Sequence, residues 1–319
     1  MSSVTAPFAL ARYRTEQGVR LGVVVGDRIR ALSADDLGAV SLNEFLAAPD
    51  WQRLADRIDR DDTWMPLAQV TLTAPVEPRQ VIQAGANYRA HVIDLVVANR
   101  APDDPRSVED LRAWAGDMMD ERRTSGDPYF FVGMPACVVG ADEPLVLPAY
   151  SDQHDWELEL AVVIGAEAFR TPREHAMQHV AGYTIVNDIT TRDLVFRKDM
   201  KEIGTDFFRA KHAPGFLPTG PLLVPAPFVD PGRLTISLEL NGQKMQHAST
   251  SDLLFDVPAL VSAASHTMPL LPGDLLLTGS PSGNGTHWGR LLRDGDVMVG
   301  AIDGLGTQTV RCVAERSPS

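Results

Sequence analysis

Two glutamates, Glu157 and Glu159, lie two residues apart in the stretch DWELELAVVIG, whose other residues are typical of a buried strand. Side chains alternate across a strand, so both carboxylates are expected on one face. Two buried like charges require a proton, a basic partner or a metal ion, and no lysine or arginine stands between Arg123 and Arg170. An edge strand whose glutamates point to water is the alternative.

A third carboxylate, Asp188, follows the next strand-like segment in GYTIVNDITTRD. One helical segment joins the two strands, so their ends can be neighbours. Alone, Asp188 would be interpreted as a turn residue. Together with Glu157 and Glu159 it forms a set of hard oxygen donors without histidine or thiolate, which favours Mg²⁺, Mn²⁺ or Ca²⁺ over zinc.

These motifs together resemble the fumarylacetoacetate hydrolase family. GANYRAH is similar to the family's glycine-x-Asn-Tyr-x-x-His segment, Lys211 precedes PTGP at the spacing of the family's active-site lysine, and LLPGDLLLTGSPSGNG is similar to its C-terminal half. The resemblance covers about residues 75–312. It implies a mixed α/β, mostly β fold of the fumarylacetoacetate-hydrolase β-roll type, a homodimer, and a divalent metal on Glu157, Glu159 and Asp188.

The resemblance also implies a reaction class, because known members cleave, decarboxylate, hydrate or isomerise 2-oxo and 2,4-dioxo carboxylic acids. The carboxylate and neighbouring carbonyl of such an acid chelate one metal, which stabilises the enolate that leaves when a C–C bond breaks. We therefore expect hydrolytic C–C cleavage of a 2,4-dioxo, acylpyruvate-like acid. The alternatives are decarboxylation, hydration or keto–enol isomerisation at the same metal, and a metal-binding protein without turnover.

Three catalytic residues follow from the resemblance. His91 would activate water, and Asp94, one turn further on the same helix face, would orient the imidazole and raise its pKa. The water-activating relatives carry Glu at the second position, which is one methylene longer. Lys211 would hold negative charge that develops on an oxygen. Outside this context, each would be interpreted as an ordinary surface or core residue.

The predicted substrate-binding residues are Tyr88 of GANYRAH, Arg192 of the family's Arg-Asp pair, and the turn Thr278, Gly279 and Ser280, which keeps a hydroxyl where many relatives read Thr-Gly-Thr-Pro.

The surrounding pocket departs from the family. The common Phe-x-Lys-Pro reads Phe131-Val132-Gly133-Met134, the common Lys-Gly-Phe-Asp begins as Lys211-His212-Ala213-Pro214, and Leu194-Val195 replace a usual glutamine. The predicted metal site therefore matches the family better than the predicted substrate pocket does.

The elements that position these residues fall into two predicted domains, a small β-rich N-terminal domain over residues 1–75 and a catalytic domain over residues 76–319. FALARYR, VRLGVVVG and RIRALS are typical of short strands, and SLNEFLAAPDWQRLADRI of a helix broken near Pro49. Asn241-Gly242 between apolar runs predicts a two-residue hairpin. Helices are expected in TPREHAMQHV, capped by Thr171, and in DVPALVSAASHTM, capped by Asp256.

An acidic insert over residues 102–127 contains SVEDLRAWAGDMMDERR, which predicts a helix that starts at Ser107. Either it lies on the surface or it forms a lid over the site.

The bulk composition is that of an ordinary soluble globular protein, with 319 residues, 44% hydrophobic and 22% charged. The net charge of −13 and the absence of a basic block argue against nucleic acid and anionic membrane as partners. The family resemblance implies a small anionic 2-oxo or 2,4-dioxo acid as substrate, and an acidic protein that binds an anion needs a local cation, which a metal could supply. The two cysteines, Cys137 and Cys312, have no motif spacing, and no secretory signal or long apolar run is evident, so we expect a cytoplasmic protein.

Overall fold

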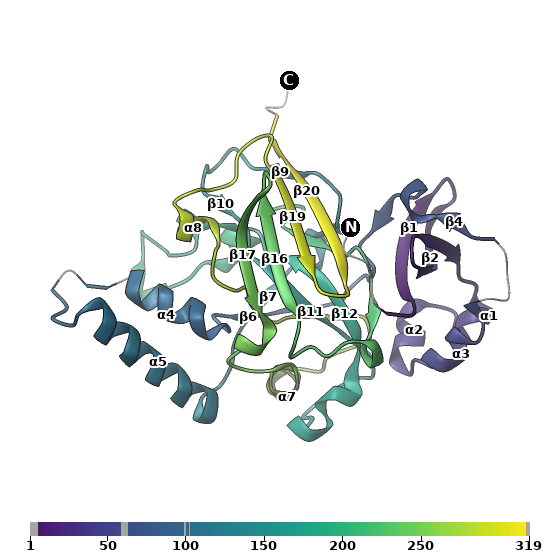
Figure 1. Cartoon of the computed structure of the whole chain (residues 1–319), viewed down its shortest axis with the longest axis horizontal. Helices are drawn as coiled ribbons and strands as arrows, with labels where there is room; N and C mark the ends of the chain where they lie inside the picture. The colour runs from purple at the N-terminus through teal and green to yellow at the C-terminus, as the bar shows by residue number, and fades with distance from the viewer. Residues whose placement is uncertain (1–5, 59–62, 99, 102, 317–319) are drawn as a thin grey trace.

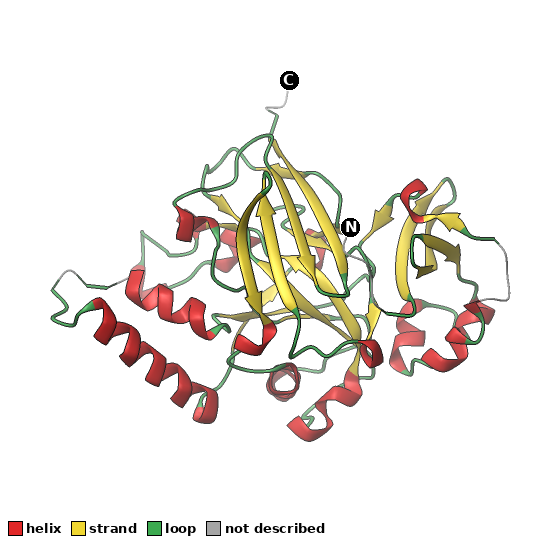
Figure 2. Ribbon diagram, viewed as in Figure 1, coloured by secondary structure: helices red, strands yellow, loops and turns green. Residues whose placement is uncertain are grey.

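The computed structural model describes residues 6–58, 63–98, 100–101 and 103–316 (Figure 1). Strands form the centre of the molecule and helices lie at its periphery (Figure 2). The mixed α/β, mostly β fold predicted from the sequence is confirmed. No helix among the described residues is long and apolar enough to cross a membrane.

The N-terminal part forms its own antiparallel sheet, at the right of Figure 1. Its strands, in sheet order, are β4 (Met65–Pro66), β3 (Arg28–Ala31), β2 (Gly18–Val25), β1 (Ala9–Thr15) and β5 (Leu72–Thr73). The helices beside it are α1 (Ala34–Leu37), α2 (Leu42–Ala47) and α3 (Trp51–Ala55). The predicted helix break near Pro49 lies between α2 and α3, where Asp50 caps the second helix.

The largest sheet contains both strands predicted to bear the site. In order it runs β7 (Tyr129–Gly133), β6 (Val81–Gly85), β18 (Leu275–Leu277), β11 (Leu158–Ile164), β12 (Val180–Asn187), β14 (Leu217–Thr219) and β8 (Val138–Gly140), with β15 (Val224–Pro225) beside β12. Strand β11 is antiparallel to both of its neighbours and fully buried. This interior position excludes the edge-strand alternative for the glutamates.

A second sheet lies in front of the first in Figure 1, and its strands are antiparallel except for the parallel pair of β20 and β9. Its order is β17 (Gln243–Ser249), β16 (Thr235–Leu240), β19 (Val297–Ile302), β20 (Gly306–Ala314) and β9 (Leu145–Leu147). The hairpin predicted at Asn241-Gly242 joins β16 to β17, and both turn residues have positive φ, 53° and 80°. Such φ values are those of the two-residue turn that Asn-Gly favours.

Strand β11 is apolar on both faces because it is covered on both sides. On one face, Leu158 and Leu160 belong to a core shared with Ile236 and Met298 of the second sheet. On the other, Val163 belongs to a core shared with Phe8, Leu10 and Leu46 of the N-terminal part. The site strand is therefore held between two apolar layers.

Two helices form an antiparallel pair at the left of Figure 1, α4 (Arg89–Ala98) and α5 (Val108–Ser125). Helix α5 lies within the predicted insert, of which Pro102 is outside the described residues, and the side chain of Ser107 caps it by accepting from the amide of Asp110 at 3.0 Å. The other helices are α6 (Phe207–Lys211), α7 (Val257–Thr267) and α8 (Gly285–Trp288).

Of the two helices predicted with caps, one is confirmed and one is corrected. Asp256 caps α7, as expected. The helix predicted from Thr171 is instead a 3-10 helix, Arg173–His179, without a side-chain cap. The reason is tertiary, because the backbone of Thr171 hydrogen-bonds to Ser265 and Ser262 of α7 and fixes the chain there.

The remaining short elements connect these layers. A two-stranded ladder pairs β10 (His154–Asp155) with β13 (Thr190–Thr191), and 3-10 turns lie at Leu67–Gln69, Pro135–Cys137, Arg192–Leu194, Lys201–Ile203, Ala226–Phe228 and Thr250–Asp252. The small ladder matters for the site, because it brings the residues that follow β12 next to those that precede β11.

Candidate metal centre and active site

Three carboxylates meet where β11 begins and β12 ends. Glu157 precedes β11, Glu159 lies in it, and Asp188 follows β12. The register pairs Leu158 with Asn187, and the amide of Asp188 donates to the carbonyl of Glu157 at 2.8 Å. One ligand oxygen from each carboxylate lies within 4.8 Å of the others, so the structure brings together the three residues predicted from the sequence.

The donor set of this cluster fits a divalent metal ion. All three groups offer carboxylate oxygens, which Mg²⁺, Mn²⁺ and Ca²⁺ prefer. The Oδ1 atom of Asp188 is buried and has no hydrogen-bond partner among the described residues, so it is available as a ligand. These residues could therefore hold such an ion.

Two cations from later in the chain compensate Glu157, and one of them also compensates Asp188. Lys211, on α6, donates through Nζ to Glu157 Oε2 at 2.8 Å, to Asp188, and to Thr190 Oγ1 at 2.7 Å. Arg192 Nη1 contacts Glu157 Oε1 at 2.7 Å. The basic partners that are missing near Glu157 in the sequence come from the segments after β12.

The three carboxyl groups have different pKa values for physical reasons. Burial raises the pKa of Glu157, but Lys211 and Arg192 outweigh it and lower the value to about 2. Burial and the charges of Asp188 and Glu157 raise the pKa of Glu159 well above its ordinary range. Burial, with repulsion from Glu157, also raises that of Asp188 against the opposing effect of Lys211. Without a further cation, the cluster therefore favours fewer than three negative charges.

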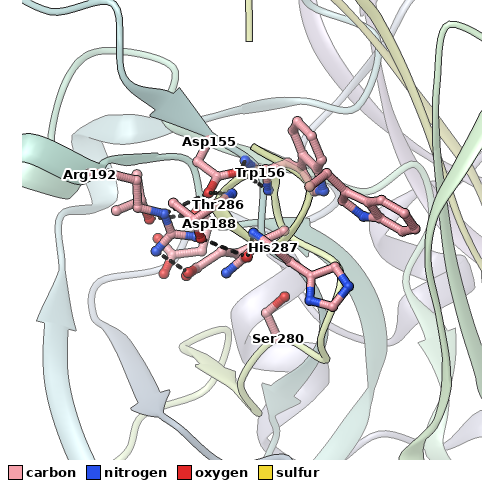
Figure 3. Close-up of polar contacts among 12 residues, drawn as sticks. Asp155, Trp156, Asp188, Arg192, Ser280, Thr286 and His287 are labelled. Carbon is pink, nitrogen blue, oxygen red and sulfur yellow. Dashed lines mark hydrogen bonds and ion pairs between the residues drawn. The ribbon is translucent and has the colours of Figure 1, made fainter. Parts of the chain in front are cut away.

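Asp155 fixes the guanidinium of Arg192. Its fully buried carboxylate accepts from Arg192 Nε at 2.7 Å and from the amides of Trp156, Gly285 and Thr286 (Figure 3). The sequence interpretation missed Asp155. Its signal was present, because Asp155, Glu157 and Glu159 alternate with period two.

The predicted substrate-binding turn is in direct contact with the carboxylate cluster. The amide of Gly279 donates to Glu159 Oε2 at 2.7 Å, the hydroxyl of Thr278 donates to the carbonyl of Leu160 at 3.0 Å, and Ser280 Oγ accepts from Gln246 Nε2 at 2.9 Å. Gly279 has φ +94°, and a Cβ there would lie 3.0 Å from that of Asn87, so the turn requires glycine.

Tyr88, the other predicted binding residue, lies fully buried beside the carboxylates. Burial and the nearby charge of Glu159 raise its pKa, so its hydroxyl stays protonated. That hydroxyl has no hydrogen-bond partner among the described residues. It is therefore a free donor next to Glu159.

His91 lies in the first turn of α4, where the charges of Glu157, Arg192 and Asp94 affect its pKa. Burial lowers its pKa, and the opposing effects of Glu157 and Asp94 do not reverse this. The expected increase in the pKa of His91 is therefore wrong in its net direction, because desolvation of the imidazolium exceeds the attraction of the carboxylate. A neutral imidazole at neutral pH suits a general base.

The carboxylate of Asp94 forms hydrogen bonds with residues other than His91. Oδ1 accepts from Arg112 Nη2 at 2.7 Å and Oδ2 accepts from Ser282 Oγ at 3.0 Å. No hydrogen bond joins Asp94 to His91 in the described parts of the chain. The role of this pair as a dyad stays a prediction.

Other residues near the lysine were also missed. Thr190 accepts from Lys211, and the ring of Phe131 lies 5.3 Å from Lys211 Nζ while stacking on Phe207 at 4.4 Å. Gln83 of β6 faces Asp188. Gln83 had a usable signal, since it is a lone polar residue in the apolar strand VIQAG. The aromatic contacts had no such signal in the sequence, because they join segments that are far apart along the chain.

Comparisons with known proteins agree with this geometry. The profile described as fumarylacetoacetate (FAA) hydrolase C-terminal matches residues 80–313. A fumarylacetoacetate hydrolase domain-containing protein 2 homolog of Dictyostelium discoideum is 30% identical over 92% of both chains. An oxaloacetate tautomerase of Bacillus subtilis is 34% identical over 76% of this chain and 72% of its own.

A solved structure with the same fold contains a metal ion. The maleylpyruvate hydrolase of Sphingobium sp. SYK-6, in complex with manganese(II) and pyruvate, is 28% identical with a TM-score of 0.72, and the match covers 97% of this chain and all of that one. The predicted β-roll of this type is thereby confirmed. The relatives include hydrolases and a tautomerase.

Proposed function

The chain belongs to the fumarylacetoacetate hydrolase family, and from this premise we propose that it is a divalent-metal-dependent hydrolase that cleaves a C–C bond in a 2,4-dioxo, acylpyruvate-like acid. The observation that carries the proposal is the largely buried cluster of three carboxylates, with Lys211 and Arg192 beside it and a neutral histidine on α4. Magnesium or manganese fits the oxygen donors.

Glu157, Glu159 and Asp188 would hold the ion, and when bound it would polarise the substrate carbonyl and favour the enolate form of the leaving group. The chain's own residues supply the rest. Lys211 provides a fixed positive charge for an oxygen that becomes negative, and the adjacent Phe131 ring limits water there. His91, kept neutral by burial, takes a proton from water.

A second candidate is keto–enol tautomerisation of a 2-oxo acid such as oxaloacetate. Two observations favour it, the similarity to an oxaloacetate tautomerase and the engagement of Asp94 with Arg112 and Ser282 rather than with His91. Tautomerisation moves a proton and needs no activated water, so it does not require the dyad.

The test is a panel of acylpyruvates and oxaloacetate, incubated with the full chain and Mg²⁺ or Mn²⁺. Loss of enol absorbance with two acid products supports the hydrolase. Keto–enol interconversion without cleavage supports the tautomerase, and CO₂ release supports a decarboxylase. Inactivity across the whole panel contradicts all three and favours metal binding without turnover.

A further inference from the structure

Gln83 is a buried side chain whose hydrogen-bonding groups are unused. It lies in β6 between β7 and β18, opposite Phe131 and Leu277, and only 1% of it is exposed. Neither Nε2 nor Oε1 has a hydrogen-bond partner among the described residues. A buried amide without partners costs stability, so its presence suggests a ligand that satisfies it.

The amide lies on the side of the sheet that carries the carboxylate cluster. Gln83 is paired across the strands with Phe131, whose ring lies 5.3 Å from Lys211 Nζ, and Lys211 donates to Asp188. Asp188 Oδ1 is also buried and unpaired. The unpaired amide of Gln83 and the unpaired oxygen of Asp188 are suited to binding a third polar group, because each is buried with an unused hydrogen-bonding atom.

The neighbouring strand leaves this space open for Gln83. At Gly133 of β7, a Cβ would lie 2.6 Å from Gln83 Oε1 and 3.0 Å from Val81 Cγ1. Gly133 is the position at which the chain departs from the Phe-x-Lys-Pro of many relatives. The glutamine amide thus occupies the region that a side chain from β7 would otherwise fill.

Few other donors near the carboxylates are unused. Lys211 already donates to Glu157, Asp188 and Thr190, which takes all three of its hydrogens. The Nε and Nη1 atoms of Arg192 are also engaged. The buried donors that remain unpaired include Gln83 Nε2, the Tyr88 hydroxyl and Arg192 Nη2.

We propose that Gln83 is a substrate-binding residue, whose Nε2 donates a hydrogen bond to an oxygen of the 2-oxo acid group bound beside Asp188. This inference rests on the proposed function and names a residue that selects its substrate.

The test uses oxalate, a planar mimic of the 2-oxo acid group, titrated calorimetrically into the Mg²⁺-loaded full chain. Gln83→Met keeps the length of the side chain and removes its donor. We expect about a tenfold to hundredfold loss of oxalate affinity, the range for a hydrogen bond to a charged acceptor. Affinity for Mg²⁺ stays within about twofold, and the Tm without metal stays equal or rises, because an unpaired amide has been removed.

Two further variants separate binding from structure. Gln308→Met is the matched control, because Gln308 is equally buried but donates to the carbonyl of Pro218 at 3.0 Å, so it should lower the Tm and leave oxalate affinity unchanged. Gly133→Ala displaces the amide of Gln83 without removing it, and should also weaken oxalate binding.

Wild-type oxalate affinity in a folded Gln83→Met protein would overturn the inference, and so would a lowered Tm with unchanged binding, as in the control. If the wild type itself binds neither Mg²⁺ nor oxalate, the proposed function fails, and this inference fails with it. The first two outcomes leave the proposed function standing, so the two failures are distinguishable.

Discussion

At the scale of single residues, the two glutamates of the site differ in how their negative charges are compensated. Glu157 contacts both Lys211 and Arg192, and its pKa of about 2 keeps it ionised under all ordinary conditions. Among the residues that the structure describes, Glu159 has only the amide of Gly279 as a hydrogen-bond donor, and burial together with repulsion from Asp188 and Glu157 raises its pKa. One member of the E-x-E pair is thus permanently charged, and the other depends on an added cation.

The first prediction concerns the ligands. Glu157→Gln or Asp188→Asn should abolish activity and weaken Mg²⁺ binding by at least about tenfold, because each removes a ligand charge while the amide keeps the volume. Calorimetric Mg²⁺ titration and circular dichroism measure binding and folding. Glu167→Gln, at an exposed site further along the same segment, is the control and should behave as wild type. Full activity of either ligand variant, or activity in excess chelator, contradicts the metal assignment.

The second prediction concerns His91 and pH. A general base must be unprotonated, so activity should rise with pH through the pKa of His91, which burial places below the ordinary 6.5. Asp94 favours the charged imidazole, so Asp94→Asn should move this limb to still lower pH. A pH–rate profile of both proteins checks the direction. A limb above 6.5, or one that moves upward in the variant, contradicts the assignment of His91 as the base.

The third prediction separates the two candidate reactions. For hydrolysis, His91→Ala should lower the rate by about 10²–10⁴-fold, the usual range for a lost general base, and leave metal binding nearly unchanged. For tautomerisation or decarboxylation, Lys211→Ala should be the more damaging change, because no water is activated. Steady-state rates of both variants on the preferred substrate decide the order. An order in which only Lys211 matters favours the alternative over hydrolysis.

At the scale of elements, two ion pairs join α4 to α5, and hydrogen bonds join this helix pair to the body. Within the pair, Arg112 binds Asp94 and Arg89 binds Asp120 at 2.7 Å. Toward the body, Arg123 donates to the carbonyl of Leu253 and Asp94 accepts from Ser282. The two ion pairs are largely exposed, and exposed pairs contribute only about 0–1 kcal/mol each. Because α4 bears His91, any movement of this pair would change the distance from the base to the carboxylates.

The fourth prediction tests whether the insert over residues 102–127 is a lid. If it closes over a ligand, Mg²⁺ and oxalate together should slow amide hydrogen exchange in α5. Exchange in β20, far along the chain and within the second sheet, serves as the internal control and should not change. Equal exchange of α5 with and without saturating oxalate would identify it as a surface helix.

At the scale of the whole molecule, large apolar side chains are exposed on one segment after the site. Phe208 is 71% and Phe196 68% exposed, with Met200 and Ile203 between them in the sequence. A cavity of about 520 Å³, lined by Tyr150, Leu194, Phe208 and His212 among others, adjoins this segment. Several large apolar side chains exposed within one segment are typical of a subunit interface.

The fifth prediction is therefore that the protein is a homodimer that uses this surface. Sedimentation equilibrium should give twice the chain mass of 34.7 kDa. Phe208→Asp should shift the protein toward monomer by burying a charge in the interface. Val40→Asp, which places the same charge at another exposed apolar residue, should leave the mass unchanged. A wild type that remains monomeric at high concentration contradicts the prediction.

The sequence determined what depends on local periodicity and on residue types at short spacing. The alternation around Glu157 and Glu159, the Asn241-Gly242 turn and the caps at Ser107 and Asp256 follow from backbone geometry within a few residues, and all have the structure expected. The cluster with Asp188 was also predictable, because consecutive strands of a sheet tend to be neighbours.

Only the tertiary structure decided how these groups are charged and paired. The cations beside Glu157, the bonds of Asp94 to Arg112 and Ser282, and the unpaired amide of Gln83 all involve residues far apart in the sequence. The pKa of His91 falls because burial outweighs a carboxylate one turn away. Desolvation depends on everything packed around a group, and no spacing in the sequence contains that information.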